Sequence, residues 1–150
     1  MKFVLQRVQK ASVDVDGETV GKIGKGYLLF VGVVENDDKE IADKMIEKVS
    51  RLRIFEDENG KTNLSIDQVG GEILVISQFT LCADCKKGNR PSFINAGSPK
   101  MAEEIYEHIL TRCQGLFKNT QKGIFGADMK VSLVNDGPFT LVLDSTVICN

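Results

Sequence analysis

An aliphatic run of four residues, Ile73–Ile76, constrains the fold more than any other stretch of this chain. It has no polar alternation and follows two glycines, which is typical of a strand buried on both faces, although a buried helix can give the same short pattern. Polar side chains follow at its exit, at Ser77, Gln78 and Thr80, with Phe79 among them. A rigid strand that delivers such groups to an open loop is a common way to build a site. The alternative is a strand that simply ends in polar turn residues.

The other patterns predict a β-rich chain with two helices. Strands are expected at Phe3–Val8, in a hairpin over Ser12–Ile23, at Tyr27–Val34, at Met129–Val134 and at Phe139–Leu143, with a turn at Asn135–Pro138 joining the last two. Gly115–Gly126 is expected to be a connection. About six or seven strands with few helices between them favour an α+β fold, in which a compact, β-rich, barrel-like or twisted sheet is flanked by two helices.

Both helices are predicted from their caps and their apolar periodicity. The first is expected to begin near Asp37 or Asp38, with Asn36 or Asp37 as its N-cap. The second is expected to begin at Pro99, with Ser98 as its N-cap. Apolar residues recur at helical spacing in each helix and predict its buried face. In the first helix these residues are Ile41, Met45, Val49 and Leu52, and Ala42 and Ile46 widen the face. In the second helix they are Ala102, Ile105, Ile109 and Cys113.

The length and the net charge of the chain limit the classes of function that it can have. One hundred and fifty residues suit a single domain over residues 1–150 with a true core. A net charge of −2 excludes a nucleic-acid binder of the histone kind, so any RNA contact would come from local patches such as Lys86, Lys87 and Arg90. No apolar run approaches a membrane span and no signal peptide precedes the first strand, which predicts a cytoplasmic protein without membrane attachment.

Cys82-x-x-Cys85 is the most conspicuous short motif. A zinc site would need about two further ligands near by, and the chain offers only His108, Cys113 and Cys149. A redox motif would precede a helix N-terminus, whereas the following Lys86–Pro91 predicts no helix. We therefore expect free thiols, no metal and no cofactor, with reversible disulfide chemistry as a minor alternative.

The usual signatures of a hydrolase are absent. A serine or threonine nucleophile needs an adjacent base, and the single histidine, His108, would have to reach Ser77 or Thr80 from another element. The chain has no Gly-x-Ser-x-Gly motif and no glycine-rich phosphate loop. An enzyme with this sequence is therefore expected to lack an ordinary protein general base.

Gly137-Pro138 is the second unusual feature of the chain. A hairpin turn is the default interpretation of such a pair. The functional alternative is a cis bond before the proline, which orients two backbone carbonyls in a way that no trans peptide can.

Ser77–Leu81 and Asn135–Thr140 together resemble the paired signatures of D-aminoacyl-tRNA deacylases. Either motif alone is weak, but the combination is specific. Shorter matches in the same order and spacing extend the resemblance over essentially the whole chain, at Gln6-Arg7-Val8, Ala11-Ser12-Val13, Arg90–Phe93 and Asp128-Met129.

The resemblance implies a homodimer of barrel-like subunits with the active site at the subunit interface. The family hydrolyses the ester that joins a D-amino acid, or glycine, to the 3′-terminal adenosine of tRNA, so tRNA is the implied partner. The implied catalytic residues are Ser77, Gln78, Phe79 and Thr80. The implied substrate-binding residues are Gly137 and Pro138, which would be inserted into the partner's site, Met129 at the adenine pocket, Arg7, Asn135 and Thr140.

The chemistry of such an ester suits this chain, because the ester is already activated and needs mainly an oriented water and a stabilised oxyanion. Backbone N–H groups near Phe79 and Thr80 could stabilise the oxyanion, and the substrate's ribose 2′-hydroxyl could supply the missing base. A second possibility makes the Thr80 hydroxyl the nucleophile. Carbonyls at Gly137 and Pro138, held by Arg7, would leave room only for hydrogen on one side of the substrate Cα, which rejects L-residues and admits glycine.

The chain departs from the family pattern at Cys82 and Cys85, where non-thiol residues are more usual, and at Phe139, where a smaller β-branched residue is usual. A different class of function also stays open. A deacylase fold without activity could serve as an RNA-binding module through the loop Lys86–Arg90, but the intact Ser77–Thr80 and Gly137-Pro138 motifs favour the enzyme.

Overall fold

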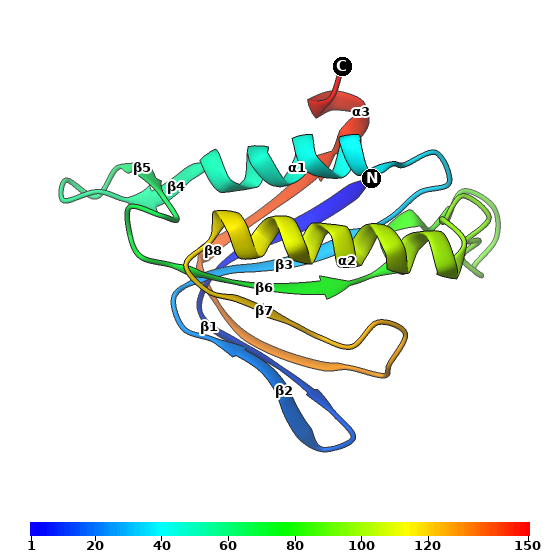
Figure 1. The fold of residues 1–150 in the computed structure, drawn as a ribbon, viewed down its shortest axis with the longest axis horizontal. Helices are drawn as coiled ribbons and strands as arrows, with labels where there is room; N and C mark the ends of the chain where they lie inside the picture. The colour runs from blue at the N-terminus through cyan, green and yellow to red at the C-terminus, as the bar shows by residue number, and fades with distance from the viewer.

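A single long strand, β1, organises the computed structural model, which describes residues 1–150. The elements in chain order are β1 (Lys2–Val15), β2 (Glu18–Ile23), β3 (Gly26–Gly32), α1 (Lys39–Arg51), β4 (Arg53–Glu56), β5 (Thr62–Ser65), β6 (Glu72–Ser77), the 3₁₀ turn η1 (Phe79–Cys82), α2 (Pro99–Leu116), β7 (Thr120–Lys122), β8 (Lys130–Asp144) and α3 (Ser145–Ile148). Figure 1 shows α1 and α2 on one face of the sheet and β2 curling below the other.

The sheet is a nearly closed barrel. One side of β1 pairs with β3 through Lys2–Val8 and with β2 through Ala11–Val15, while β8 runs antiparallel along its other side. β6 joins β3 in parallel, and β7 joins β6 in parallel. β2 then comes back against β7, where a Cβ built on Gly21 would lie 2.6 Å from the carbonyl oxygen of Lys122. The predicted α+β fold with a barrel-like sheet is confirmed.

Two apolar cores hold the barrel and the helices together. The larger core lies between the sheet and the helices and takes in the predicted lines of both helices, with Met45, Val49, Ile105 and Ile109 fully or almost fully buried. Burial on this face explains the period of the apolar residues in each helix. The smaller core fills the barrel interior and consists of Val8, Ala11, Val13, Ile23, Leu28, Leu74 and Ile76. Ile73–Ile76 contributes to both cores, as expected of a strand buried on both faces.

The start of the first helix differs from the prediction. Asp38, not Asn36 or Asp37, is the N-cap, and its side chain accepts the N–H of Ile41. Asp37 is buried instead, and its carboxylate accepts hydrogen bonds from the amino group of Met1 at 2.6 Å and from the N–H of Val34 at 2.7 Å. A buried carboxylate needs such donors. The local pattern gives no sign of the contact with Met1, because that amino group lies 36 residues away in the chain.

The C-terminal part also differs from the prediction. Residues 130–144 form one continuous strand, so Asn135–Pro138 is not a hairpin turn between two strands. Part of the predicted connection Gly115–Gly126 belongs to α2 and to the short strand β7. The third helix, α3, was not expected from the pattern. None of the helices combines the length and apolar character that crossing a membrane requires.

We predict that Gly21→Ala destabilises the fold and that Gly115→Ala does not. The added methyl at position 21 would clash with the β7 backbone where the barrel closes, which should lower the free energy of unfolding by about 1–3 kcal/mol. Position 115 lies in α2 with no atom within 4 Å of the added carbon, so alanine should raise the free energy of unfolding by about 0.5–1 kcal/mol. Urea unfolding of both variants measures the difference. Equal midpoints would show that β2 and β7 do not close the barrel tightly.

Candidate active site

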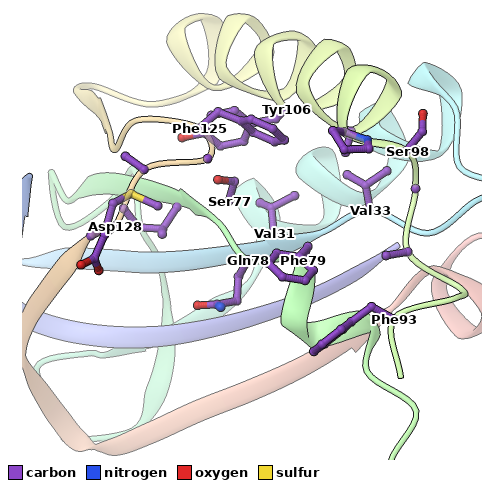
Figure 2. Close-up of a pocket in the computed structure, with 18 of the residues that line it drawn as sticks. Val31, Val33, Ser77, Gln78, Phe79, Phe93, Ser98, Tyr106, Phe125 and Asp128 are labelled. Atoms are coloured by element: carbon purple, nitrogen blue, oxygen red, sulfur yellow. The ribbon is translucent and has the colours of Figure 1, made fainter. Parts of the chain in front are cut away.

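A cavity of about 640 Å³ opens at the end of β6, where the polar residues predicted from the sequence lie. Ser77, Gln78 and Phe79 line it, together with Met129. The other walls come from the end of β3, the first two turns of α2 and the segment 125–131 (Figure 2). The cavity therefore brings together four of the ten predicted site residues.

β6 positions the catalytic candidates through its pairing with β3. Ser77 lies opposite Val31, and the N–H of Gln78 donates to the Val31 carbonyl at 2.7 Å. The chain then turns into η1, whose first two N–H groups, those of Phe79 and Thr80, make no backbone hydrogen bond. N–H groups without a partner can bind an oxyanion, and of these two residues Phe79 lines the cavity.

Thr80 does not line the cavity, although it adjoins residues that do. Its hydroxyl oxygen accepts the side-chain amide of Gln78 at 2.5 Å. No histidine or carboxylate is hydrogen-bonded to this hydroxyl, so no protein group is placed to take its proton.

Aromatic side chains that the sequence analysis did not identify form much of the cavity wall. The hydroxyl of Tyr106 donates to the carbonyl of Val75 at 2.8 Å, and its ring lies 5.9 Å from that of Phe125. Burial raises the pKa of Tyr106 well above its ordinary value, so it stays protonated and structural. At the mouth, Phe93 makes an edge contact with Phe79 at 5.0 Å between ring centroids (Figure 2).

One carboxylate, Asp128, lies at the rim of this cavity. It is exposed and forms an ion pair with Lys130 at 3.0 Å. Figure 2 shows it on the side of the cavity opposite Phe93. No candidate catalytic side chain is hydrogen-bonded to it.

The remaining predicted residues form a second group around a bulge in β8. Asn135 pairs with Val8 and Thr140 pairs with Gln6, so four residues, 136 to 139, lie opposite Arg7 alone. The side chain of Asn135 braces the bulge by accepting the N–H of Phe139 at 2.7 Å and donating to the hydroxyl of Thr140 at 2.9 Å. Gly137 and Pro138 are exposed at the tip, and the bond between them is cis.

Arg7 supports this bulge from below. Its side chain is buried, with Nε donating to the carbonyl of Asp136 at 2.9 Å and Nη1 donating to the carbonyl of Ile54 at 2.6 Å. The guanidinium also lies 4.7 Å from the centroid of the Phe139 ring. Of the expected contacts between Arg7 and backbone carbonyls of the loop, the structure shows the one to Asp136, while the second acceptor, Ile54, lies in β4. The effect of Arg7 on substrate selection stays a prediction.

None of the residues in the bulge lines the cavity. Within one chain, the Ser77–Phe79 group and the Gly137-Pro138 group are thus two separate features.

Neither the cysteines nor the histidine lines the cavity. Cys82 is buried and its thiol contacts the Val33 carbonyl at 3.3 Å, and burial raises the pKa of this thiol, which lowers its reactivity. Cys85 is exposed, so the two thiols of the motif lie in different surroundings. His108 joins α2 to Asp43 of α1 at 2.7 Å and does not line the cavity.

Comparison with known proteins identifies the family. The family model described as D-Tyr-tRNA(Tyr) deacylase matches residues 4–144. The chain belongs to this family. It is 56% identical to a D-aminoacyl-tRNA deacylase of Lactobacillus acidophilus over 96% of this chain and 99% of that one. It is 50% identical to that of Thermosipho africanus over 97% of each. The predicted hydrolase type, a D-aminoacyl-tRNA deacylase, is confirmed by this membership.

Solved structures share the fold. The chain is similar to a structure named c-Myc DNA Unwinding Element Binding Protein, with a TM-score of 0.91 and 39% identity over 96% of this chain and 98% of that one. A structure described as a probable eukaryotic D-amino acid tRNA deacylase superposes with a TM-score of 0.84 at 14% identity, covering 95% and 97% of the two chains, and shows the likeness of fold alone.

We predict that Arg7→Lys destabilises the protein more than Arg51→Lys. A lysine has one ammonium and cannot reach both carbonyls that Arg7 binds, so a buried acceptor is left unpaired and the free energy of unfolding should fall by about 1–3 kcal/mol. Arg51 is exposed on α1, and its change to lysine should stay within about 0.5 kcal/mol. Urea unfolding compares the two, and equal stability would argue against Arg7 as the support of the bulge.

Proposed function

We propose that this chain hydrolyses the ester between a D-amino acid or glycine and the 3′-terminal adenosine of tRNA, as a cytoplasmic homodimer in which residues 1–150 form one catalytic domain. The observation that carries the proposal is the cavity at the end of β6. It joins Phe79, whose backbone N–H makes no backbone hydrogen bond, to an aromatic wall, and it includes no base beside a nucleophile. Family membership supplies the substrate class.

The reaction would rely on orientation and on backbone donors. The aromatic wall, with Met129, offers apolar surface for an adenine ring, which places the ester beside Ser77–Phe79. The N–H groups of Phe79 and Thr80 would stabilise the oxyanion that forms as water attacks the carbonyl. The ribose 2′-hydroxyl, adjacent to the ester, would assist the water in place of a protein base.

The alternative role of Thr80 as the nucleophile is less well supported. Its hydroxyl is engaged by Gln78 and lies outside the lining of the cavity. A threonine needs a base to become nucleophilic, and none contacts it.

Selection against L-residues is proposed to come from the bulge of a second copy. The exposed backbone of Gly137 and Pro138 would face the substrate Cα and leave room only for hydrogen. A D-residue would then direct its side chain to solvent, and glycine would be accepted because it has no side chain. The braces from Arg7 and Asn135 would keep these carbonyls in position.

We propose that the dimer contact lies next to the bulge. Val142 is 74% exposed on the β8 edge, and it continues in register across the same face to the half-buried Val4 and Phe30. A row of apolar side chains that is only partly covered on one face of a sheet is typical of a surface covered by a partner. Pairing of two copies along this row would bring the bulge of one copy toward the other copy.

We expect the wild-type protein to deacylate D-tyrosyl-tRNA and glycyl-tRNA and to spare L-tyrosyl-tRNA. Asn135→Ala removes the two side-chain hydrogen bonds that hold the bulge. The kcat/KM for the D ester divided by that for the L ester should therefore fall by about tenfold, which corresponds to the roughly 1–1.5 kcal/mol of one hydrogen bond. Asn59→Ala, in a remote exposed turn, serves as the control. Absence of any cleavage by the wild type would refute the proposed function and favour an RNA-binding module. Unchanged selectivity in Asn135→Ala would refute only the role of the bulge.

Thr80→Val tests the source of the base. If the ribose 2′-hydroxyl assists the water, the variant should keep kcat within about tenfold of wild type, while a tRNA ending in 2′-deoxyadenosine should lose about a hundredfold or more. Thr62→Val is the matched control, expected to stay within about threefold because this threonine is exposed in β5 and does not line the cavity. Loss of all activity in Thr80→Val with an unaffected 2′-deoxy substrate would reverse the assignment.

A further inference from the structure

The loop Asp84–Ile94 stands beside the mouth of the cavity and has no part in the chemistry described above. Its neck is closed by Asp84 and Ser92, whose backbones exchange two hydrogen bonds at 2.7 and 2.9 Å. The Asp84 carboxylate turns inward to accept the N–H of Lys86 at 2.8 Å. The loop is therefore held at a defined place even though all its residues are exposed.

The charge of this loop is unusual for this protein. It carries Lys86, Lys87 and Arg90 against one acid, Asp84, in a chain whose net charge is −2. None of the three cations forms an ion pair. Three of the cations on the helices, Lys44, Arg51 and Arg112, pair with acids, whereas the three cations of the loop lie together in sequence without such a partner. A cluster of unpaired cations attracts a polyanion such as a nucleic-acid backbone.

Two apolar side chains, Phe93 and Ile94, end the same loop. Phe93 lines the cavity and contacts Phe79. Ile94 follows it and is 80% exposed. Cations next to an exposed aromatic ring are the combination that binds single-stranded nucleic acid, because phosphates meet the cations while a base stacks on the ring.

We propose that the loop Asp84–Ile94 binds the unpaired nucleotides that precede the 3′-terminal adenosine of the tRNA. Lys86, Lys87 and Arg90 bind their phosphates, and Phe93 with Ile94 packs against a base. The inference rests on the proposed function, since the terminal adenosine must occupy the cavity for the preceding nucleotides to cross its rim. It adds a contact that supplies affinity for the tRNA and takes no part in the hydrolysis.

The test uses the triple variant Lys86→Gln, Lys87→Gln, Arg90→Gln and two substrates, D-tyrosyl-tRNA and the short ester 3′-O-(D-tyrosyl)adenosine. The short ester fills the cavity but has no phosphate for the loop. We expect KM for the tRNA to rise about tenfold or more with kcat unchanged, and the slope of log kcat/KM against log salt to fall by about 2 for three lost phosphate contacts. Cleavage of the short ester should be unchanged. The control variant Lys10→Gln, Lys48→Gln, Lys61→Gln removes three exposed, unpaired cations outside the cavity lining and should behave as wild type on both substrates.

Three results would overturn the inference. Unchanged KM and salt dependence on the tRNA would show that the loop does not bind it. An equal fall in kcat/KM for the tRNA and for the short ester would show that the loop acts on the part of the substrate inside the cavity. A change of oligomeric state of the triple variant in size-exclusion chromatography would assign the loop to a contact between copies. If the wild type cleaves neither ester, the proposed function fails. The role of the loop is then tested separately, by comparing how tightly the wild type and the triple variant bind uncharged tRNA at different salt concentrations.

Discussion

The geometry around Arg7 sets the shape of the most exposed part of the site. A regular ladder would place one β8 residue opposite Arg7, but the structure places four there. The extra residues lose their ladder hydrogen bonds, and the bulge would be loose if nothing replaced them. The guanidinium of Arg7 replaces part of them by binding Asp136, and the side chain of Asn135 binds Phe139. A buried cation, satisfied by carbonyls, thus shapes an exposed loop of backbone.

The two halves of the candidate site share one rigid sheet. The bulge belongs to β8, the N–H groups of Phe79 and Thr80 follow β6, and β1 and β3 connect these strands by continuous pairing. Groups on such a framework hold their positions better than groups on separate loops. Both the proposed catalytic end and the proposed selective end are therefore built from backbone whose position depends on strand pairing. The side chains beneath, such as Arg7, support them without contacting the cavity.

Local patterns in the sequence were enough to predict the buried strand at Ile73–Ile76, both long helices and the class of fold, because each buries a regular apolar face. They could not predict β7, whose three residues, Thr120–Lys122, are all polar or charged and pair only because β6 lies beside them. They also placed a turn within β8, since Gly137 and Pro138 usually end a strand and the sequence does not show that Arg7 bridges the bulge. Tyr106 and Phe125 were missed as cavity residues for a similar reason. Helical periodicity marks Tyr106 only as a neighbour of the buried line, and Phe125 lies in a stretch without periodicity.

The absence of a protein base beside Thr80 is consistent with the kind of ester proposed. An ester to a ribose hydroxyl has a good leaving group and a neighbouring hydroxyl, so positioning and a stabilised oxyanion can account for much of the rate. A stronger nucleophile would also attack L-aminoacyl esters that approach the site, and discrimination would then depend entirely on binding. A site built from backbone donors acts only on an ester that is held in one orientation. In such a site, the geometry that speeds the reaction is the same geometry that selects the substrate.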